Sequence, residues 1–92
     1  MSQGVIKNSS IKYVVVENIT TAADGFFALN SSNIGGRIVS CIALGTHLII
    51  PSALAIYSNN EEYYFASLNA STLAKEASTN IGSVRVYYIP MN

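Results

Sequence analysis

The stretch Ile81–Pro90 constrains the fold most, because it alternates like a β-strand along its whole length and almost ends the chain. Successive side chains of a strand point to opposite faces of its sheet. The residues predicted to face the core are Val84, Val86 and Tyr88, and those predicted to face outward are Arg85, Tyr87 and Ile89. We expect a strand at this position to pair with strands that precede it. We therefore expect an antiparallel all-β fold in which the last strand closes the structure.

The length and composition of the chain predict one domain. Ninety-two residues, half of them apolar and 11% charged, suffice for one modest hydrophobic core. We expect a single β-sandwich domain over residues 1–92, with a polar lead-in over residues 1–10.

Runs of β-branched and aromatic residues, separated by turn residues, recur at short spacing and predict about six to eight strands. The predicted strand regions are Ile11–Thr20, Phe26–Leu29, Arg37–Leu44, Leu48–Ile50, Ala53–Tyr57, Tyr63–Leu68 and Ile81–Pro90. This pattern, without a long helical period, favours a sandwich or small barrel over an α/β fold, and the expected architecture is a small antiparallel β-sandwich of the jelly-roll type.

Two hairpins are expected from the turn residues. The first joins Ile11–Thr20 to Phe26–Leu29 through Asp24 and Gly25, and the second joins Ala53–Tyr57 to Tyr63–Leu68. The turn of the second hairpin is predicted over residues 58–62.

Several local features carry finer expectations. Arg37–Leu44 is almost continuously apolar, which is typical of a strand in the middle of a sandwich. Pro51 marks a bulge or a strand boundary, because proline cannot donate to a ladder. Asn30–Gly36 has the composition of a loop, and Ser71–Ser78 is either a short helical turn or an irregular loop. In the first strand we expect one shared face, formed by Ile11, Tyr13, Val15 and Ile19.

The sequence offers little catalytic chemistry. Its only histidine, His47, lies in a short turn, and no serine stands in a nucleophile-elbow pattern. Glu61 and Glu62 are adjacent and point to opposite sides, so they are interpreted as residues of a solvated turn. The lone Cys41 lies in an apolar run and is expected to be buried. We predict a protein that is not an enzyme, with no metal site and no cofactor.

Charge and hydropathy argue against two classes of partner. Five basic residues balance five acidic ones, whereas nucleic-acid binding requires clustered Lys and Arg. The apolar region Ile38–Tyr57 is long enough to span a bilayer, but Gly45, His47 and Pro51 interrupt it. We expect neither nucleic-acid binding nor membrane insertion.

Aromatic residues are the main resource for binding. Tyr57, Tyr63 and Tyr64 flank the polar turn that contains Asn59, and together these four residues form a candidate ligand site. A tyrosine platform beside amide and carboxylate groups suits a sugar ring, which combines an apolar face with hydroxyl groups. Packing of the tyrosines within the sandwich is the alternative interpretation.

The near-neutral composition also suggests self-association. A surface with few charges and no net charge resists association poorly, so an exposed apolar face is expected to be covered by another copy or a partner. The outward side of the last strand, formed by Arg85, Tyr87 and Ile89, is the predicted oligomer contact.

Three stretches resemble a known family. They are Ile19–Leu29, with its Thr-Thr, Asp-Gly and alternating-strand pattern, the central run Ile38–Tyr57, and the ending Gly82–Ile89. In their order they resemble small C-terminal β-sandwich modules of phage and prophage tail proteins, of the receptor-binding or baseplate-accessory type.

The resemblance implies a bacteriophage virion protein of the tail-fibre or baseplate kind. It implies a homotrimer that contacts other virion proteins and takes host-surface saccharides as a candidate ligand. Its location would be the phage tail, and the bacterial cytoplasm before assembly. Two alternatives stay open: a purely structural head or tail decoration protein, and a bacterial carbohydrate-binding module unrelated to phage. Under this resemblance, the chain is expected to be either an excised head domain or a small protein encoded alone.

Overall fold

The fold is an all-β sandwich, as the sequence predicts. The computed structural model describes residues 10–58 and 60–90, so the predicted lead-in lies almost wholly outside the described residues, as does Asn59. Within the described ranges there are six strands and one short helix. Their bounds are β1 Lys12–Thr20, β2 Phe26–Asn30, α1 Ser31–Ile34, β3 Gly36–Ala43, β4 His47–Tyr57, β5 Asn60–Asn69 and β6 Asn80–Pro90.

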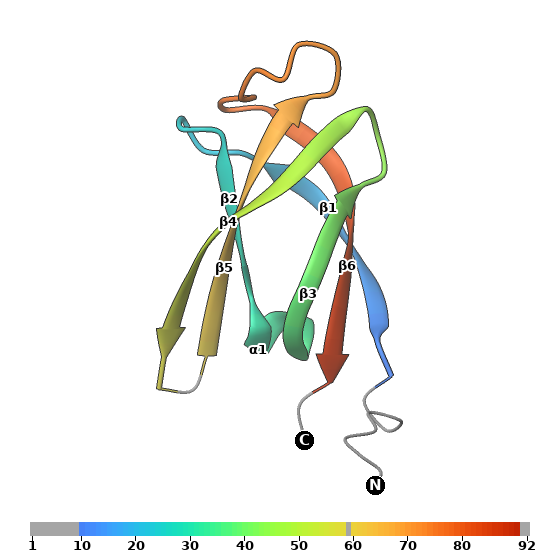
Figure 1. The fold of residues 1–92 in the computed structure, drawn as a ribbon, viewed down its shortest axis with the longest axis vertical. Coiled ribbons are helices and arrows are strands. Elements are labelled where there is room, and N and C mark those ends of the chain that lie inside the picture. Colours follow the sequence, from blue (N-terminus) through green and yellow to red (C-terminus); the bar gives the residue numbers. More distant parts are fainter. Residues whose placement is uncertain (1–9, 59, 91–92) are drawn as a thin grey trace, which may run out of the picture.

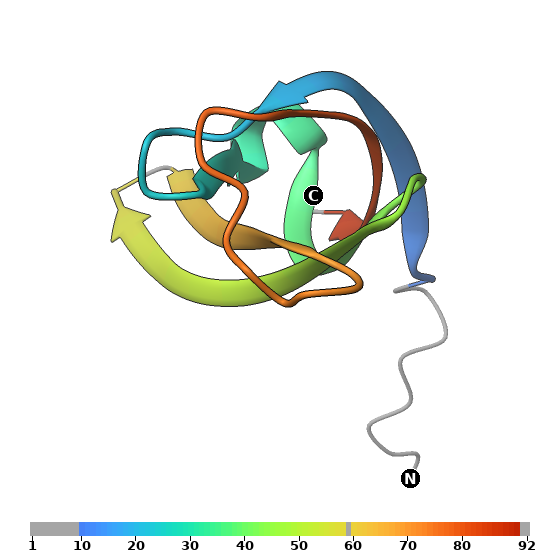
Figure 2. The same cartoon turned by 90° about the horizontal axis from the view of Figure 1, so that it is seen from above.

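The strands form two antiparallel sheets of three strands each (Figure 1). The first sheet has the order β1-β6-β3, and the second has the order β2-β5-β4. The last two strands of the chain, β6 and β5, thus lie at the centres of the two sheets and pair with the four strands that precede them. This wrapped order is that of a jelly roll with six strands instead of eight. Viewed along the long axis, the six strands surround a common interior (Figure 2).

The core lies between the two sheets and follows the alternation of the strands. Val84 and Val86 of β6 are completely buried, as predicted for the inward face of the closing strand, whereas Tyr88, the third predicted member of that face, is half-buried. They pack in one cluster with residues of both sheets, among them Phe27, Ile38 and Phe65. The rings of Phe27 and Phe65 stack with their centroids 5.6 Å apart. Burial of these side chains supplies the main driving force for folding.

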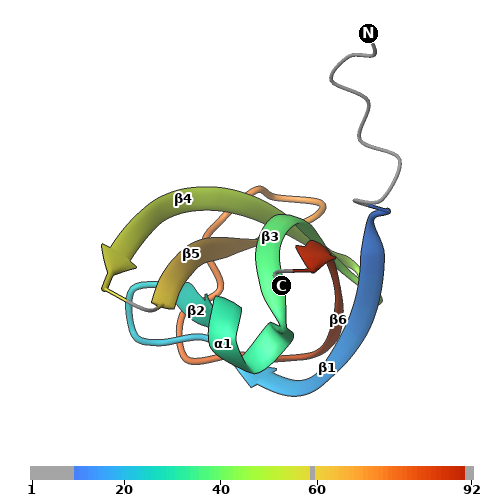
Figure 3. The ribbon, with the colours of Figure 1, turned by 90° about the horizontal axis from the view of Figure 1, so that it is seen from below.

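The ends of the sandwich are closed differently. At one end, α1 lies below the interior (Figure 3), and Gly35, with φ of 102°, ends the helix in a left-handed conformation that glycine adopts without strain. At the other end, the segment between β5 and β6 passes over the interior (Figure 2). Residues 71–78 form turns with an isolated bridge at Lys75, so of the two predicted forms the irregular loop is observed.

The predicted first hairpin is wrong. β1 pairs with β6 and β2 pairs with β5, so the turn between β1 and β2 connects the two sheets instead of two neighbouring strands. The second hairpin is confirmed, since β4 and β5 pair over their full lengths. Its turn is shorter than predicted, because Glu61 and Glu62 belong to β5.

Three further expectations need comment. Leu48–Ile50 and Ala53–Tyr57, predicted as separate strands, belong to the single strand β4, and its register with β5 shifts between Pro51 and Ala53, so of the two predicted alternatives at Pro51 the bulge is observed. β3 is an edge strand with Val39 and Ile42 exposed, so its apolar run does not mark the middle of a sheet. The predicted loop Asn30–Gly36 contains the one-turn helix α1.

The predicted common face of β1 is divided by a bulge. The register with β6 shifts after Val16, and Asn18 takes a positive φ of 59°. Such a bulge adds a residue and reverses the alternation of the side chains that follow. Ile19 therefore packs against the core together with Val14 and Val16. The expected partners of Ile19, which are Ile11, Tyr13 and Val15, are exposed instead.

Candidate functional site

The β4–β5 hairpin brings two of the predicted tyrosines together on the outer face of the second sheet. In the register of the hairpin, Tyr57 lies opposite Asn60, and Glu62 and Tyr64 follow on the same side. The Tyr64 hydroxyl donates to Glu62 Oε1 over 2.7 Å, and the Tyr57 hydroxyl donates to the same oxygen over 3.4 Å. We call Tyr57, Glu62 and Tyr64 the hairpin-end cluster. The carboxylate of Glu62 is a member that the predicted set did not include.

Of the two aromatic rings of the cluster, Tyr57 is 54% exposed and Tyr64 is half-buried. Tyr64 pairs with Ala28 on one side and Ala53 on the other, so only small side chains flank its ring within the sheet. The hydrogen bond to the Glu62 carboxylate raises the pKa of Tyr64, because it stabilises the protonated phenol. The cluster therefore offers a neutral aromatic surface beside an acceptor of hydrogen bonds.

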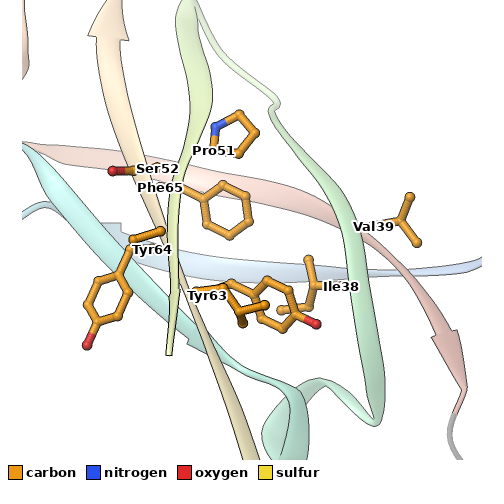
Figure 4. A pocket seen from close by; sticks show the side chains of 9 residues that line it. Ile38, Val39, Pro51, Ser52, Tyr63, Tyr64 and Phe65 are labelled. Carbon is orange, nitrogen blue, oxygen red and sulfur yellow. The ribbon is translucent and has the colours of Figure 1, made fainter. Parts of the chain in front are cut away.

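Tyr63 points to the other side of the sheet and is separated from the cluster. Figure 4 shows the rings of Tyr63 and Tyr64 directed away from each other, with Tyr63 beside Ile38 of β3. The Tyr63 hydroxyl donates to Glu61 Oε1, and Arg37 Nη2 lies 3.3 Å from Glu61 Oε2. Burial, followed by the bond to Glu61, raises the pKa of Tyr63. The predicted four-residue site is thus divided between two faces, with Asn59 outside the described residues.

Tyr63 contributes to a cleft between the edge strands β3 and β4. The cleft has a volume of about 360 Å³, and its lining includes Ile38, Leu54 and Phe65 (Figure 4). It is largely apolar.

The predicted oligomer contact lies at the centre of the outer face of the first sheet. Arg85 and Tyr87 are half-buried residues of β6, and the Arg85 guanidinium lies 5.0 Å from the ring centroid of Tyr13 on β1. Arg85 Nη1 also donates to the Tyr87 hydroxyl over 3.3 Å. The two tyrosine rings are 6.0 Å apart. Ile89, the third predicted residue, is half-buried further along the strand.

Edge-strand residues that the sequence reasoning missed contribute most of the exposed surface of this outer face. Val15 and Ile42 both pair with Arg85, from β1 and β3. Tyr13 is 60% exposed and Ile42 is 45% exposed. The alternation of side chains in β1 and β3 is the sequence signal for these outward-facing residues. It was misinterpreted because a bulge divides β1 and because β3 was predicted to lie in the middle of the sandwich.

A second cleft, which the sequence reasoning did not anticipate, opens between β1 and β2. It has a volume of about 440 Å³. Its lining includes Asn18, Thr20, Asp24, Phe26 and Tyr64, and we call this set the β1–β2 cleft. Tyr64 thus belongs both to the hairpin-end cluster and to this cleft. The residues lie far apart in the sequence and come together because β1 and β2 are edge strands of different sheets.

A polar cluster around Glu76 fastens the segment between β5 and β6. His47 Nδ1 lies 2.7 Å from Glu76 Oε1, and the Ser67 hydroxyl donates to the same oxygen over 2.9 Å. The Thr21 hydroxyl donates to the backbone carbonyl of Glu76. His47 is thereby held in place by a carboxylate that no sequence pattern indicated.

The described residues offer few groups for other chemistry. No cluster of three or more His, Cys, Asp or Glu residues that would hold a metal ion occurs in ranges 10–58 and 60–90. Cys41 is buried as predicted, and burial raises its pKa to about 12, so its thiol is protonated at neutral pH. Among the described helices, none has the length and apolar character needed to cross a membrane.

Comparison of the chain with family models, with curated protein sequences and with solved structures finds no significant match.

Proposed function

We propose that the protein is a non-enzymatic bacteriophage or prophage virion subunit, of the tail-fibre or baseplate type, that assembles as a homo-oligomer through the outer face of its first sheet. The observation that carries the assembly role is the apolar and aromatic character of this face. Tyr13, Val15 and Ile42 are exposed there. The virion assignment and the trimer come from the sequence resemblance.

The energetics favour a covered face. An exposure of 60% leaves roughly 120 Å² of Tyr13 in water if its side chain is taken as roughly 200 Å². Burial at about 25 cal/mol per Å² gives a gross gain of about 3 kcal/mol from this residue. The contacts of the neighbouring Arg85 with Tyr13 and Tyr87 offset part of the cost of removing its guanidinium from water, while its Nε has no hydrogen-bond partner within the described residues. Aromatic residues and Arg are also the residue types enriched in interfaces.

Sedimentation equilibrium over a range of concentrations tests this proposal. We expect an oligomer, with a trimer as the first expectation, and a strict monomer over the whole range would overturn it. Ile42→Lys should shift the equilibrium toward monomer, because it places a second cation beside Arg85 in the contact. The matched control is Ile56→Lys on the second sheet, where a more exposed isoleucine (71%) lies off the proposed face and the oligomer should persist.

A second role, binding of host-surface saccharides, is favoured by the convergence of Tyr57 and Tyr64 on Glu62. A glycan array probed with the intact protein tests it. Tyr57→Ala should weaken any binding about tenfold, since stacking and one hydroxyl are lost, whereas Thr46→Ala, at an exposed position of the β3–β4 turn away from both proposed surfaces, should leave binding unchanged. If no glycan binds, the protein is a purely structural head or tail decoration subunit.

A further inference from the structure

We propose that the β1–β2 cleft binds one ring of a neutral, hydroxyl-rich saccharide. The inference deepens the saccharide-binding role proposed above, on which it rests, by giving that role a binding pocket and a ligand class. The cleft adjoins the hairpin-end cluster through Tyr64. The bound ring would thus contact Tyr64 within a recess instead of lying on the flat surface of the sheet.

The fold creates this recess through the bulge in β1. β1 and β2 are edge strands of different sheets, so the described structure places no ladder between them. Asn18, at the bulge, has φ of 59°, a left-handed conformation that Asn tolerates better than most residues. Backbone conformations of this kind concentrate at binding sites. Asn18 and Thr20 are both exposed residues of the cleft lining.

The polar groups of the cleft suit hydroxyl groups. Asp24 Oδ1 accepts a hydrogen bond from the Phe26 backbone N–H over 3.1 Å, which holds the carboxylate in place. Within the described residues only Oδ1 is engaged, so Oδ2 can accept from a ligand. The amide of Asn18 supplies a donor and an acceptor, and the hydroxyl of Thr20 supplies both as well. Such a mixture of donors and acceptors matches a sugar ring better than a ligand with a single charged group.

Two aromatic rings supply the apolar contact. Phe26 pairs with Ala66, and Tyr64 pairs with Ala28, so the two aromatic residues are diagonal neighbours on one face of the second sheet. Side chains at diagonal positions of adjacent strands are about 7–8 Å apart and can contact one ligand together. A pyranose presents C–H groups on its face, which pack against aromatic rings.

The local charges favour a neutral ligand. Asp24 repels the carboxylate of an acidic sugar. The Lys75 ammonium lies 4.5 Å from the ring centroid of Phe26, so one charge of each sign borders the cleft and the pair favours neither an anionic nor a cationic ligand. The volume of about 440 Å³ falls in the range of small-molecule sites, about 300–1,000 Å³. The cleft is therefore large enough for a single ring with its substituents.

A titration of the ¹⁵N-labelled protein, followed by amide chemical shifts, tests the proposal. The probes are the methyl α-pyranosides of glucose, galactose and mannose, together with N-acetylglucosamine. We expect saturable shifts, at millimolar concentrations of at least one probe, at Asn18, Thr20, Asp24 and Phe26. Thr20→Val and Asp24→Asn should each weaken this binding about threefold to tenfold. Asn at position 24 retains the oxygen that accepts from Phe26, so the local fold should persist. Thr46→Val, at an exposed threonine in the β3–β4 turn, is the matched control and should bind like the parent.

Three results would overturn the proposal. The first is the absence of saturable shifts with every pyranoside. The second is stronger binding of tetramethylammonium or of N-acetylneuraminic acid, which would assign the cleft to a charged ligand. The third is binding that Thr20→Val and Asp24→Asn leave unchanged while Tyr57→Ala abolishes it. In that third case the saccharide role stands and only the cleft assignment fails, whereas a negative glycan array would remove the saccharide role itself.

Discussion

Replacement of Glu76 should destabilise the fold more than replacement of any other acidic residue in the described chain. Glu76 lies in the segment that covers one end of the sandwich, and its side chain is only 13% exposed. Its carboxylate accepts from Ser67 and His47, and its backbone N–H donates to the Ser67 carbonyl over 2.9 Å. The carboxylate therefore connects the covering segment to β5 and to the start of β4.

The magnitude follows from the groups that lose their partner. In Glu76→Ala the Ser67 hydroxyl, which is 0% exposed, loses its bond to a carboxylate in a place that water does not reach. Hydrogen bonds to charged groups contribute about 1.5–3 kcal/mol each. The bond to His47 contributes less than a fully buried one, because water partly reaches His47. We therefore expect Glu76→Ala to lower the free energy of unfolding by about 3 kcal/mol. That is a large part of the total of about 5–15 kcal/mol typical of such domains. Glu76→Gln keeps one acceptor oxygen and should cost about half as much.

Urea unfolding followed by far-ultraviolet circular dichroism measures this cost by linear extrapolation. Because the protein self-associates in our proposal, all variants should be compared at one concentration. Glu17→Ala, at an exposed position of β1, is the control and should stay within about 0.5 kcal/mol of the parent. A cost below about 1 kcal/mol for Glu76→Ala would refute the reasoning, since the buried hydroxyl of Ser67 would then not depend on the carboxylate.

Three further predictions concern stability. In Gly36→Ala the new Cβ would lie 2.2 Å from the Ile89 carbonyl oxygen, so β3 and β6 must separate locally, and we expect a loss of about 3 kcal/mol or more in thermal or urea unfolding. Asn18→Ala should cost about 1 kcal/mol, because alanine tolerates the positive φ less well than asparagine, whereas Asn18→Gly should be close to neutral. Burial raises the pKa of Cys41 from 9.0 to about 12, so the thiol ionises earlier in the unfolded chain and stability should fall as the pH rises from about 9 toward 12. The slope of the unfolding free energy against pH in this window should be smaller in Cys41→Ala, and equal slopes would contradict the assignment.

Strand identity could be predicted from the sequence because it depends on local alternation. Val84 and Val86 are buried as their spacing requires, and the β4–β5 hairpin follows from two runs separated by a short polar turn. Pro51 produces its bulge for an equally local reason, which is the missing N–H donor. These features need no knowledge of distant residues.

Strand partners could not be predicted in the same way. β1 and β2 are adjacent in sequence, but they pair with the two final strands, and the choice depends on the burial of a core shared by both sheets. The bulge at Asn18 changes which residues of β1 face outward, and no strong turn signal such as Asn-Gly or Pro accompanies it. As a result, Tyr13 and Val15 were expected beside Ile19 and are exposed instead.

The candidate site was only partly predictable for the same reason. Tyr57 and Tyr64 were predicted as site residues because they flank one turn. Tyr63, which was predicted with them, is adjacent to Tyr64 in sequence and therefore faces the opposite side of the sheet. Asn18 and Asp24 were missed as site residues because β1 and β2 belong to different sheets, and only the fold brings both residues to the same cleft as Tyr64.

The arrangement of the two sheets makes the two proposed roles compatible. The proposed contact involves Tyr13 and Ile42 on the outer face of the first sheet, whereas the hairpin-end cluster lies on the outer face of the second sheet. An oligomer formed through the first sheet therefore does not cover the hairpin-end cluster. β1 contributes to the proposed contact and to the β1–β2 cleft, but the bulge separates these two regions of the strand. Tyr13 precedes the bulge and belongs to the proposed contact, and Thr20 follows the bulge and lines the cleft. Each subunit of such an assembly would present its own cleft, so several weak sites would bind a repetitive surface with an avidity far above that of one site. A single-ring affinity in the millimolar range is then sufficient for the role that we propose.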